Sequence, residues 1–87
     1  MSHRWTESDD AVALYLYLYG ASHTGKSVDD IAQARGITPS SLRMRIGNFA
    51  SLAGKGGLGN YAQQSKNIYE RYGGLPEPQL RAIAFGK

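Results

Sequence analysis

The chain has 87 residues, no cysteine and a formal net charge of +3. This length suits one small domain, residues 1–87, whose core is only just large enough to be stable. The lack of cysteine excludes disulfides and thiolate metal sites. The Leu/Tyr run at 14–19 is too short to cross a bilayer, so we predict neither a membrane span nor a signal peptide and expect a cytoplasmic protein.

Charge is unevenly distributed along the sequence. Residues 1–34 hold two basic and five acidic residues, whereas residues 35–87 hold eight basic and two acidic ones. No acidic residue lies between Asp30 and Glu70. Because cations without neighbouring carboxylates attract phosphate, this distribution favours nucleic acid as the partner.

After an N-terminal arm (1–5), the first predicted element is a helix over residues 6–19. Thr6 followed by Asp9 matches a capping box at its start. Its second half, AVALYLYLY, is apolar on every face, which indicates a helix enclosed by others or one that offers tyrosines to a partner. The Leu-Tyr alternation also suits a strand, but no second strand is available to pair with it.

Residues 27–52 match two helices joined by a tight turn, the pattern of a helix-turn-helix. The first of these helices places its apolar residues on one face. Gly36 stands at the turn, where a positive φ is favoured. Thr38 can cap the second helix, with Pro39 at its first position, where a missing N–H has no cost.

The second helix of the motif, residues 39–53, has an apolar stripe and a polar side. The stripe consists of Leu42, Ile46, Phe49 and Ala53, spaced by four, three and four residues. Arg43, Arg45 and Asn48 lie off this stripe, so we expect them to face solvent and read a DNA groove.

Two further helices are predicted near the C-terminus. Asn60 or Ser65 can cap a helix that reaches Tyr72, and Pro76 and Pro78 introduce a last helix over 78–85. The expected inward residues are Ile68, Tyr69, Tyr72, Leu80, Ile83 and Ala84. The sequence therefore predicts an all-α single domain of four or five helices that contains a helix-turn-helix.

Two glycine-rich segments match phosphate-binding patterns. Residues 20–27, GASHTGKS, fit G-x4-G-K-S, and residues 54–59 fit G-x-G-x-x-G. Both patterns require a parallel sheet, and no further β-rich run exists. We interpret both as loops between helices, although the bare backbone of the second could touch a DNA phosphate.

No catalytic or metal-binding set can be assembled from the sequence. His3 and His23 are the only histidines. The pairs Asp9-Asp10 and Asp29-Asp30 fall in first helical turns, where negative charge favours the helix dipole. We therefore expect no metal, no cofactor and no enzymatic activity.

Four segments together resemble a known domain: Trp5-Thr6, ALYLYLYG at 13–20, DIAQARGITPSSLRMRIGNFASL at 30–52 and IYERYG at 68–73. They are similar to the helical N-terminal DNA-binding domain of HNH restriction-endonuclease-like proteins. The likeness spans residues 5–75. The histidine-rich nuclease motif of those proteins is missing, so their cleavage activity does not carry over. The resemblance implies a role related to restriction, and DNA binding by Ser40, Ser41, Arg43, Met44, Arg45 and Asn48. A role in transcription regulation, as a repressor, is a variant of the DNA-binding interpretation and would need a homodimer.

The expected partner is thus double-stranded DNA, with the helix at 39–53 in the major groove. Arg43 would pair with guanine, Met44 would contact a thymine methyl, and Asn48 would bind adenine or the backbone. The phosphate contacts would come from Arg35, Arg45, Lys55 and Lys66. The alternative is a protein-interaction module, an inhibitor or subunit. It would dock on a partner protein through Leu14, Tyr15, Leu18 and Tyr19.

Overall fold

The structure, a computed structural model, describes residues 4–54 and 61–86. These ranges contain five α-helices, one single-turn 3-10 helix and no strand, which confirms the all-α prediction. The elements are α1 (Glu7–Tyr19), η1 (Ser22–Thr24), α2 (Val28–Ala34), α3 (Pro39–Leu52), α4 (Gln63–Tyr72) and α5 (Glu77–Phe85). None of the helices in the described part of the chain is both long and apolar enough to cross a membrane.

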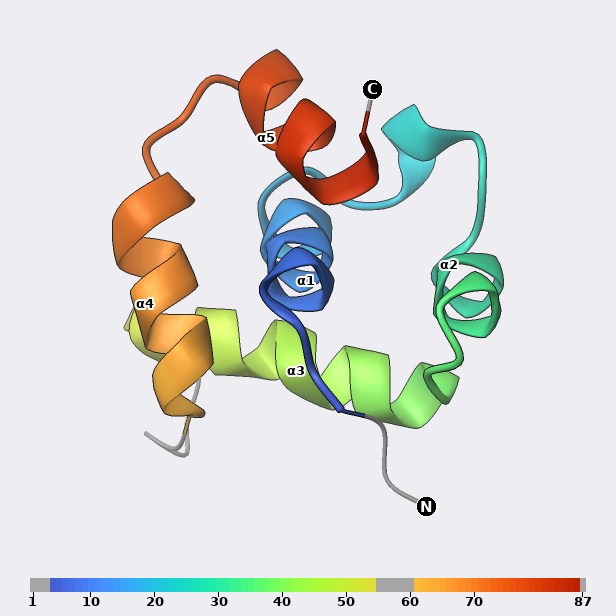
Figure 1. Cartoon of the computed structure of the whole chain (residues 1–87), viewed down its shortest axis with the longest axis horizontal. Helices are drawn as coiled ribbons and strands as arrows, with labels where there is room; N and C mark the ends of the chain where they lie inside the picture. The colour runs from blue at the N-terminus through green and yellow to red at the C-terminus, as the bar shows by residue number, and fades with distance from the viewer. Residues whose placement is uncertain (1–3, 55–60, 87) are drawn as a thin grey trace.

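Helix α1 is the centre of the fold. Figure 1 looks along its axis, with α3, α4 and α5 arranged around it and α2 farther out. Helix α1 contacts α3, α4 and α5, whereas α2 packs chiefly against α3. Helix α3 therefore lies along one edge of the assembly, with the other helices on one side of it (Figure 1).

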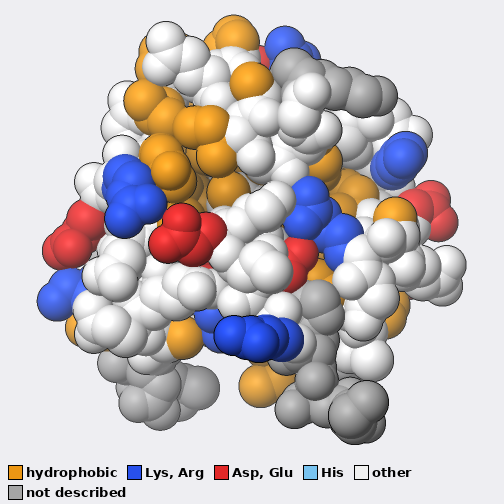
Figure 2. Space-filling model, in the orientation of Figure 1, with side chains coloured by type: hydrophobic (Ala, Val, Ile, Leu, Met, Phe, Trp, Pro, Cys, Tyr) orange, Lys and Arg blue, Asp and Glu red, His pale blue; other side chains and the backbone are white. Residues whose placement is uncertain are grey.

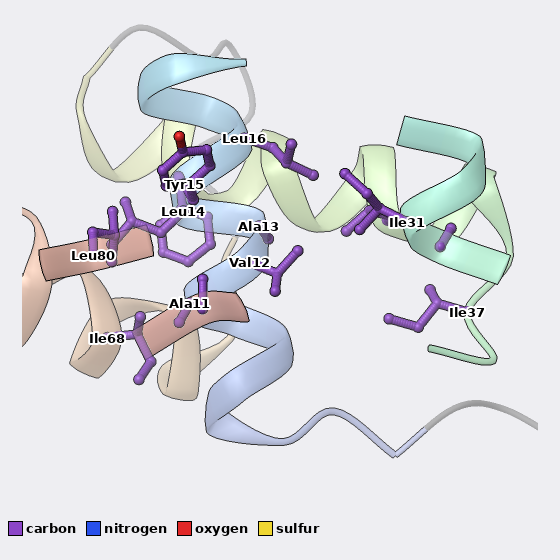
Figure 3. Close-up of a cluster of buried hydrophobic side chains, with 14 residues drawn as sticks. Ala11, Val12, Ala13, Leu14, Tyr15, Leu16, Ile31, Ile37, Ile68 and Leu80 are labelled. Atoms are coloured by element: carbon purple, nitrogen blue, oxygen red, sulfur yellow. The ribbon is translucent and has the colours of Figure 1, made fainter. Parts of the chain in front are cut away.

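The core forms around six consecutive buried residues of α1, Ala11 to Leu16. Figure 3 shows side chains from the surrounding elements directed toward this helix. The labelled ones are Ile31, Ile37, Ile68 and Leu80. The buried core also contains Ala32, Leu42, Phe49 and Ala84. Enclosure on all sides explains why residues 11–16 lack a polar face. Leu14 and Tyr15 are both fully buried, so they are not available as the partner-docking surface of the alternative interpretation.

The predicted helix ends are partly confirmed. Thr6 and Asp9 form the capping box of α1, and Gly20 follows the helix with φ of +76°. Helix α4, however, begins after Ala62 without a side-chain cap, and Ser65 is buried inside the helix instead of capping it. Asn60 lies outside the described residues. Ile83 of α5, predicted to face inward, is 40% exposed.

A hydrogen bond from Tyr15 ties α1 to the start of α5. The Tyr15 hydroxyl donates to Glu77 Oε2 at 2.5 Å, and its ring packs edge-on against Phe85. Burial of the phenol and the adjacent Glu77 carboxylate raise the pKa of Tyr15 to about 12. Both effects disfavour the phenolate, so the neutral tyrosine stabilises this helix pair.

Candidate nucleic-acid interface

Helices α2 and α3 are joined by a turn that the local sequence specifies. Gly36 has φ of +70°, and the Gly36 and Ile37 amides donate to the carbonyl oxygens of Gln33 and Ala32. This pair of bonds is a Schellman motif, which ends a helix on a left-handed residue. Thr38 then accepts a hydrogen bond from the Ser41 amide at 3.1 Å and starts α3. The predicted pair of helices joined by a tight turn is therefore present.

Helix α3 has an enclosed side and an open side. Leu42 and Phe49 are fully buried, and Ile46 packs against the core. The residues exposed on the other side follow helical spacing, which puts them in one stripe. This exposed stripe of α3 consists of Ser40, Arg43, Met44 and Gly47. Met44 is its most prominent apolar side chain, with 75% of its surface exposed.

Arg43 is accessible, as the sequence predicts. Its side chain is 58% exposed, and Nη2 lies 2.6 Å from Oδ1 of Asp29, itself 55% exposed, on α2. An ion pair this exposed contributes about 0–1 kcal/mol, because water screens both charges. Arg43 can therefore leave Asp29 for another anion at little cost.

Arg45 is largely enclosed, so the expectation that its side chain faces solvent is wrong. Its side chain is only 15% exposed, and Nε and Nη2 donate to the two carboxylate oxygens of Asp10 at 2.7 and 2.8 Å. The guanidinium carbon also lies 4.6 Å from the centre of the Trp5 ring. These contacts hold α3 against α1, so Arg45 has a structural role.

Asp10 is the centre of a polar cluster inside the protein. Fully buried, it accepts hydrogen bonds from Gln64 Nε2 at 2.6 Å and Ser65 Oγ at 2.7 Å in addition to those from Arg45. Every buried side-chain nitrogen or oxygen in the described ranges has a hydrogen-bonding partner. The helix-dipole explanation of Asp10 therefore misses its main role, which is to join α1, α3 and α4.

Arg35 also belongs to the fold. Its Nη1 donates to Asp9 Oδ1 at 2.8 Å, and its Nη2 donates to the carbonyl oxygen of Ala84 at 2.7 Å. These bonds link the end of α2 to α1 and α5. Arg35 thus has a structural role through Nη1 and Nη2, and its predicted contact with a DNA phosphate stays a prediction.

Asn48 connects α3 to the beginning of α4. Its Nδ2 donates to the carbonyl oxygen of Met44 at 3.1 Å, and its Oδ1 accepts from the Ala62 amide at 2.7 Å. The carboxamide thus makes structural bonds through both ends, and its predicted contact with adenine or the backbone stays a prediction. Tyr61, which precedes Ala62, is 43% exposed.

The remaining predicted contacts differ in accessibility. Ser40 is exposed, whereas Ser41 is half-buried and accepts a hydrogen bond from the Thr38 hydroxyl at 2.8 Å. Lys66 is half-buried on α4, and Lys55 lies outside the described residues. Of the nine predicted DNA contacts, Ser40, Arg43 and Met44 are therefore the ones placed on the exposed stripe of α3.

The segment 20–27 does not form a phosphate-binding loop. The Thr24 and Lys26 amides donate to acceptors within the segment at 3.0 and 3.1 Å, and the Gly20 amide donates to the Leu16 carbonyl oxygen of α1 at 2.9 Å. Ser27 Oγ accepts from the Asp30 amide and caps α2. A phosphate-binding loop instead directs its backbone N–H groups at the ligand. Most of the second glycine-rich match, 54–59, lies outside the described residues.

No metal site is apparent in the part of the chain that the structure describes. Its histidine and carboxylate side chains form no group of three or more that could bind an ion. His23 is exposed, and His3 lies in the undescribed N-terminal segment. No protein-family model, no curated protein and no solved structure matches this chain.

Proposed function

We propose that the protein is a non-enzymatic module that binds double-stranded DNA by placing α3 in the major groove. The observation that carries this proposal is the exposed stripe of α3, on a helix at the edge of the fold. In a helix-turn-helix the second helix meets base edges in this way. Two of the four stripe residues, Ser40 and Gly47, are small, so the helix can approach the groove closely.

Arg43 and Met44 would provide most of the base recognition. A bidentate contact of Arg43 with guanine is worth about 1–3 kcal/mol of discrimination. This exceeds the worth of its exposed pair with Asp29, about 0–1 kcal/mol, so exchange from Asp29 to guanine is favourable. Met44 can contact a thymine methyl, and Ser40 can donate to a phosphate or a base edge.

The number of phosphate contacts should be small. Arg35 and Arg45 are bound to carboxylates inside the protein. Figure 2, in the orientation of Figure 1, shows lysine and arginine side chains spread over the face in view, with acidic side chains close to several of them. We therefore expect a shallow dependence of affinity on salt, since its slope follows the number of neutralised phosphates. A homodimer would add a second half-site. A role in restriction or transcription regulation remains part of this proposal through the family resemblance.

A protein-interaction module is the less favoured candidate. Of its predicted contact residues on α1, Leu14 and Tyr15 are buried in the core, and Tyr19 is half-buried. Leu18, 37% exposed, is the accessible member of that set. One exposed leucine does not make the extended apolar patch that such a surface requires.

The test is selection of bound duplexes from a randomised pool, followed by fluorescence anisotropy at about 50 mM and about 200 mM salt. Arg43→Ala should lose about 1–3 kcal/mol on the selected duplex and less on mixed-sequence DNA. Gly47→Gln should also weaken binding, because its added side chain enters the groove while open space at the Gly47 Cβ position leaves the fold intact.

Arg71→Ala is the matched control. Arg71 is 53% exposed and also faces one carboxylate, that of Glu7 at 3.5 Å, but it lies on α4. This variant removes the same charge and should leave the selected duplex bound. Absence of DNA binding by the unaltered protein at low salt, or equal losses for Arg43→Ala and Arg71→Ala, would refute the proposal.

A further inference from the structure

A cleft of about 430 Å³ lies between the η1 turn, α2 and α5. Its volume is within the range of small-molecule sites, about 300–1,000 Å³. The lining residues come from the connection between α1 and α2, from α2 itself and from α5, and none of them belongs to α3. The cleft is therefore separate from the exposed stripe of α3.

The cleft is lined by positive groups. Lys26, Arg35 and Arg81 contribute cations to its walls, His23 contributes an imidazole ring, and no acidic residue is among the described residues that line it. Lys26 and His23 are exposed, and no side chain in residues 4–54 or 61–86 pairs with either of them. A concave surface with cations and without carboxylates concentrates anions.

Arg81 and Arg35 differ in how far their charge is compensated. Arg81 Nε lies 3.6 Å from Glu77 Oε2, beyond hydrogen-bonding distance, and that oxygen already accepts the Tyr15 hydroxyl at 2.5 Å. Arg35, in contrast, is bound to Asp9 and to the Ala84 carbonyl oxygen. Arg35 thus fixes the wall, while Lys26 and Arg81 can hold a ligand.

The backbone that carries Lys26 is held in place. The Thr24 hydroxyl donates to the Ala21 carbonyl oxygen at 2.6 Å and accepts from the Lys26 amide at 3.1 Å. A segment already fixed in this way loses little conformational entropy when a ligand binds.

Apart from Thr24, the rest of the lining is apolar. Ile31 and Phe85 contribute hydrocarbon and aromatic surface beside the cations. Apolar walls with a few convergent polar groups are typical of small-molecule sites. We propose that this cleft binds a small organic anion, with a phosphate or carboxylate head on an aromatic body. Lys26 and Arg81 hold the head, and Phe85 contacts the body.

The test titrates the full chain with phenyl phosphate and with benzoate, and NMR chemical shifts report the binding of each probe. At least one of the two probes should shift the amide resonances of His23, Arg81 and Phe85. The probe that binds more tightly identifies the head group, phosphate or carboxylate, that the cleft prefers. Inorganic phosphate, which lacks the aromatic body, and benzyl alcohol, which lacks the charge, should bind about tenfold more weakly or worse. Absence of shifts with both probes, shifts located elsewhere, or equal binding of benzyl alcohol would overturn the proposal.

Variants then test the two cations. Lys26→Gln and Arg81→Gln should each weaken the preferred probe about tenfold, since each removes one charge-assisted contact. Arg81→Lys keeps the charge and should restore most of the affinity. Arg71→Gln, the matched loss of charge on α4, should have no effect. If Arg71→Gln weakens probe binding as much as the other two variants do, the loss reflects the overall charge of the protein, and the assigned contacts are overturned.

Discussion

Replacing Asp10 by alanine should destabilise the protein by about 3–5 kcal/mol, the usual cost of removing one partner from a buried ion pair. The magnitude follows from what the substitution leaves behind. Arg45, 15% exposed, would lose both of its carboxylate acceptors, and Gln64 and Ser65 would each lose one. A domain of 87 residues has a total stability of about 4–13 kcal/mol, so this change removes a large part of it.

The assay is urea unfolding monitored by circular dichroism. With an m value of about 2 kcal/mol/M, a loss of about 4 kcal/mol in unfolding free energy lowers the urea midpoint by about 2 M. Arg45→Ala should be similarly destabilising, because it leaves the buried Asp10 carboxylate without its cation. The double variant should lose less than the sum of the two single losses. Arg43→Ala serves as the exposed control. A loss below about 1 kcal/mol for Asp10→Ala, or strict additivity with Arg45→Ala, would contradict the reasoning.

Three further changes follow from the structure. The raised pKa of Tyr15 means that the neutral phenol stabilises the fold below pH 10, and that this contribution, about 2–3 kcal/mol, is lost as the pH rises from 10 to about 12. Urea unfolding between about pH 8 and 11 should show a fall in stability that Tyr15→Phe lacks. Gly36→Ala should lower the unfolding free energy by about 1–2 kcal/mol because of its positive φ, whereas Gly47→Ala, in mid-helix with open space, should raise it by about 0.5–1 kcal/mol. Asn48→Ala should cost about 1–3 kcal/mol in thermal or urea unfolding, because the Ala62 amide loses its acceptor; an unchanged midpoint would leave Asn48 without a structural role.

The helices could be predicted because their signals are local. The caps at Thr6, Ser27 and Thr38 each bond to an amide three residues later. The Schellman motif at Gly36 is equally short-range. Such contacts depend on neighbouring residues alone, so the sequence specifies them before any tertiary packing is known.

The site was harder to predict because its decisive contacts are long-range. Asp10 and Arg45 are 35 residues apart, and the partners of Arg35 include an atom 49 residues away. A positional signal for Arg45 was nevertheless present. It follows Leu42 by three residues and precedes Phe49 by four, so it lies beside the apolar stripe of α3 and can reach inward. Asp10 comes immediately before the buried run of α1, where a carboxylate needs a partner.

The anchoring of Arg45 fixes the rotation of α3 about its own axis. Arg45 on one side of the helix makes two hydrogen bonds to Asp10, and Leu42 and Phe49 are buried in the core. Together these contacts allow α3 only one rotation about its axis. Positions 40, 43, 44 and 47 can then be exchanged together without disturbing the core. A library randomised at these four positions should remain folded while it displays different surfaces, so the protein can serve as a scaffold for new binding preferences.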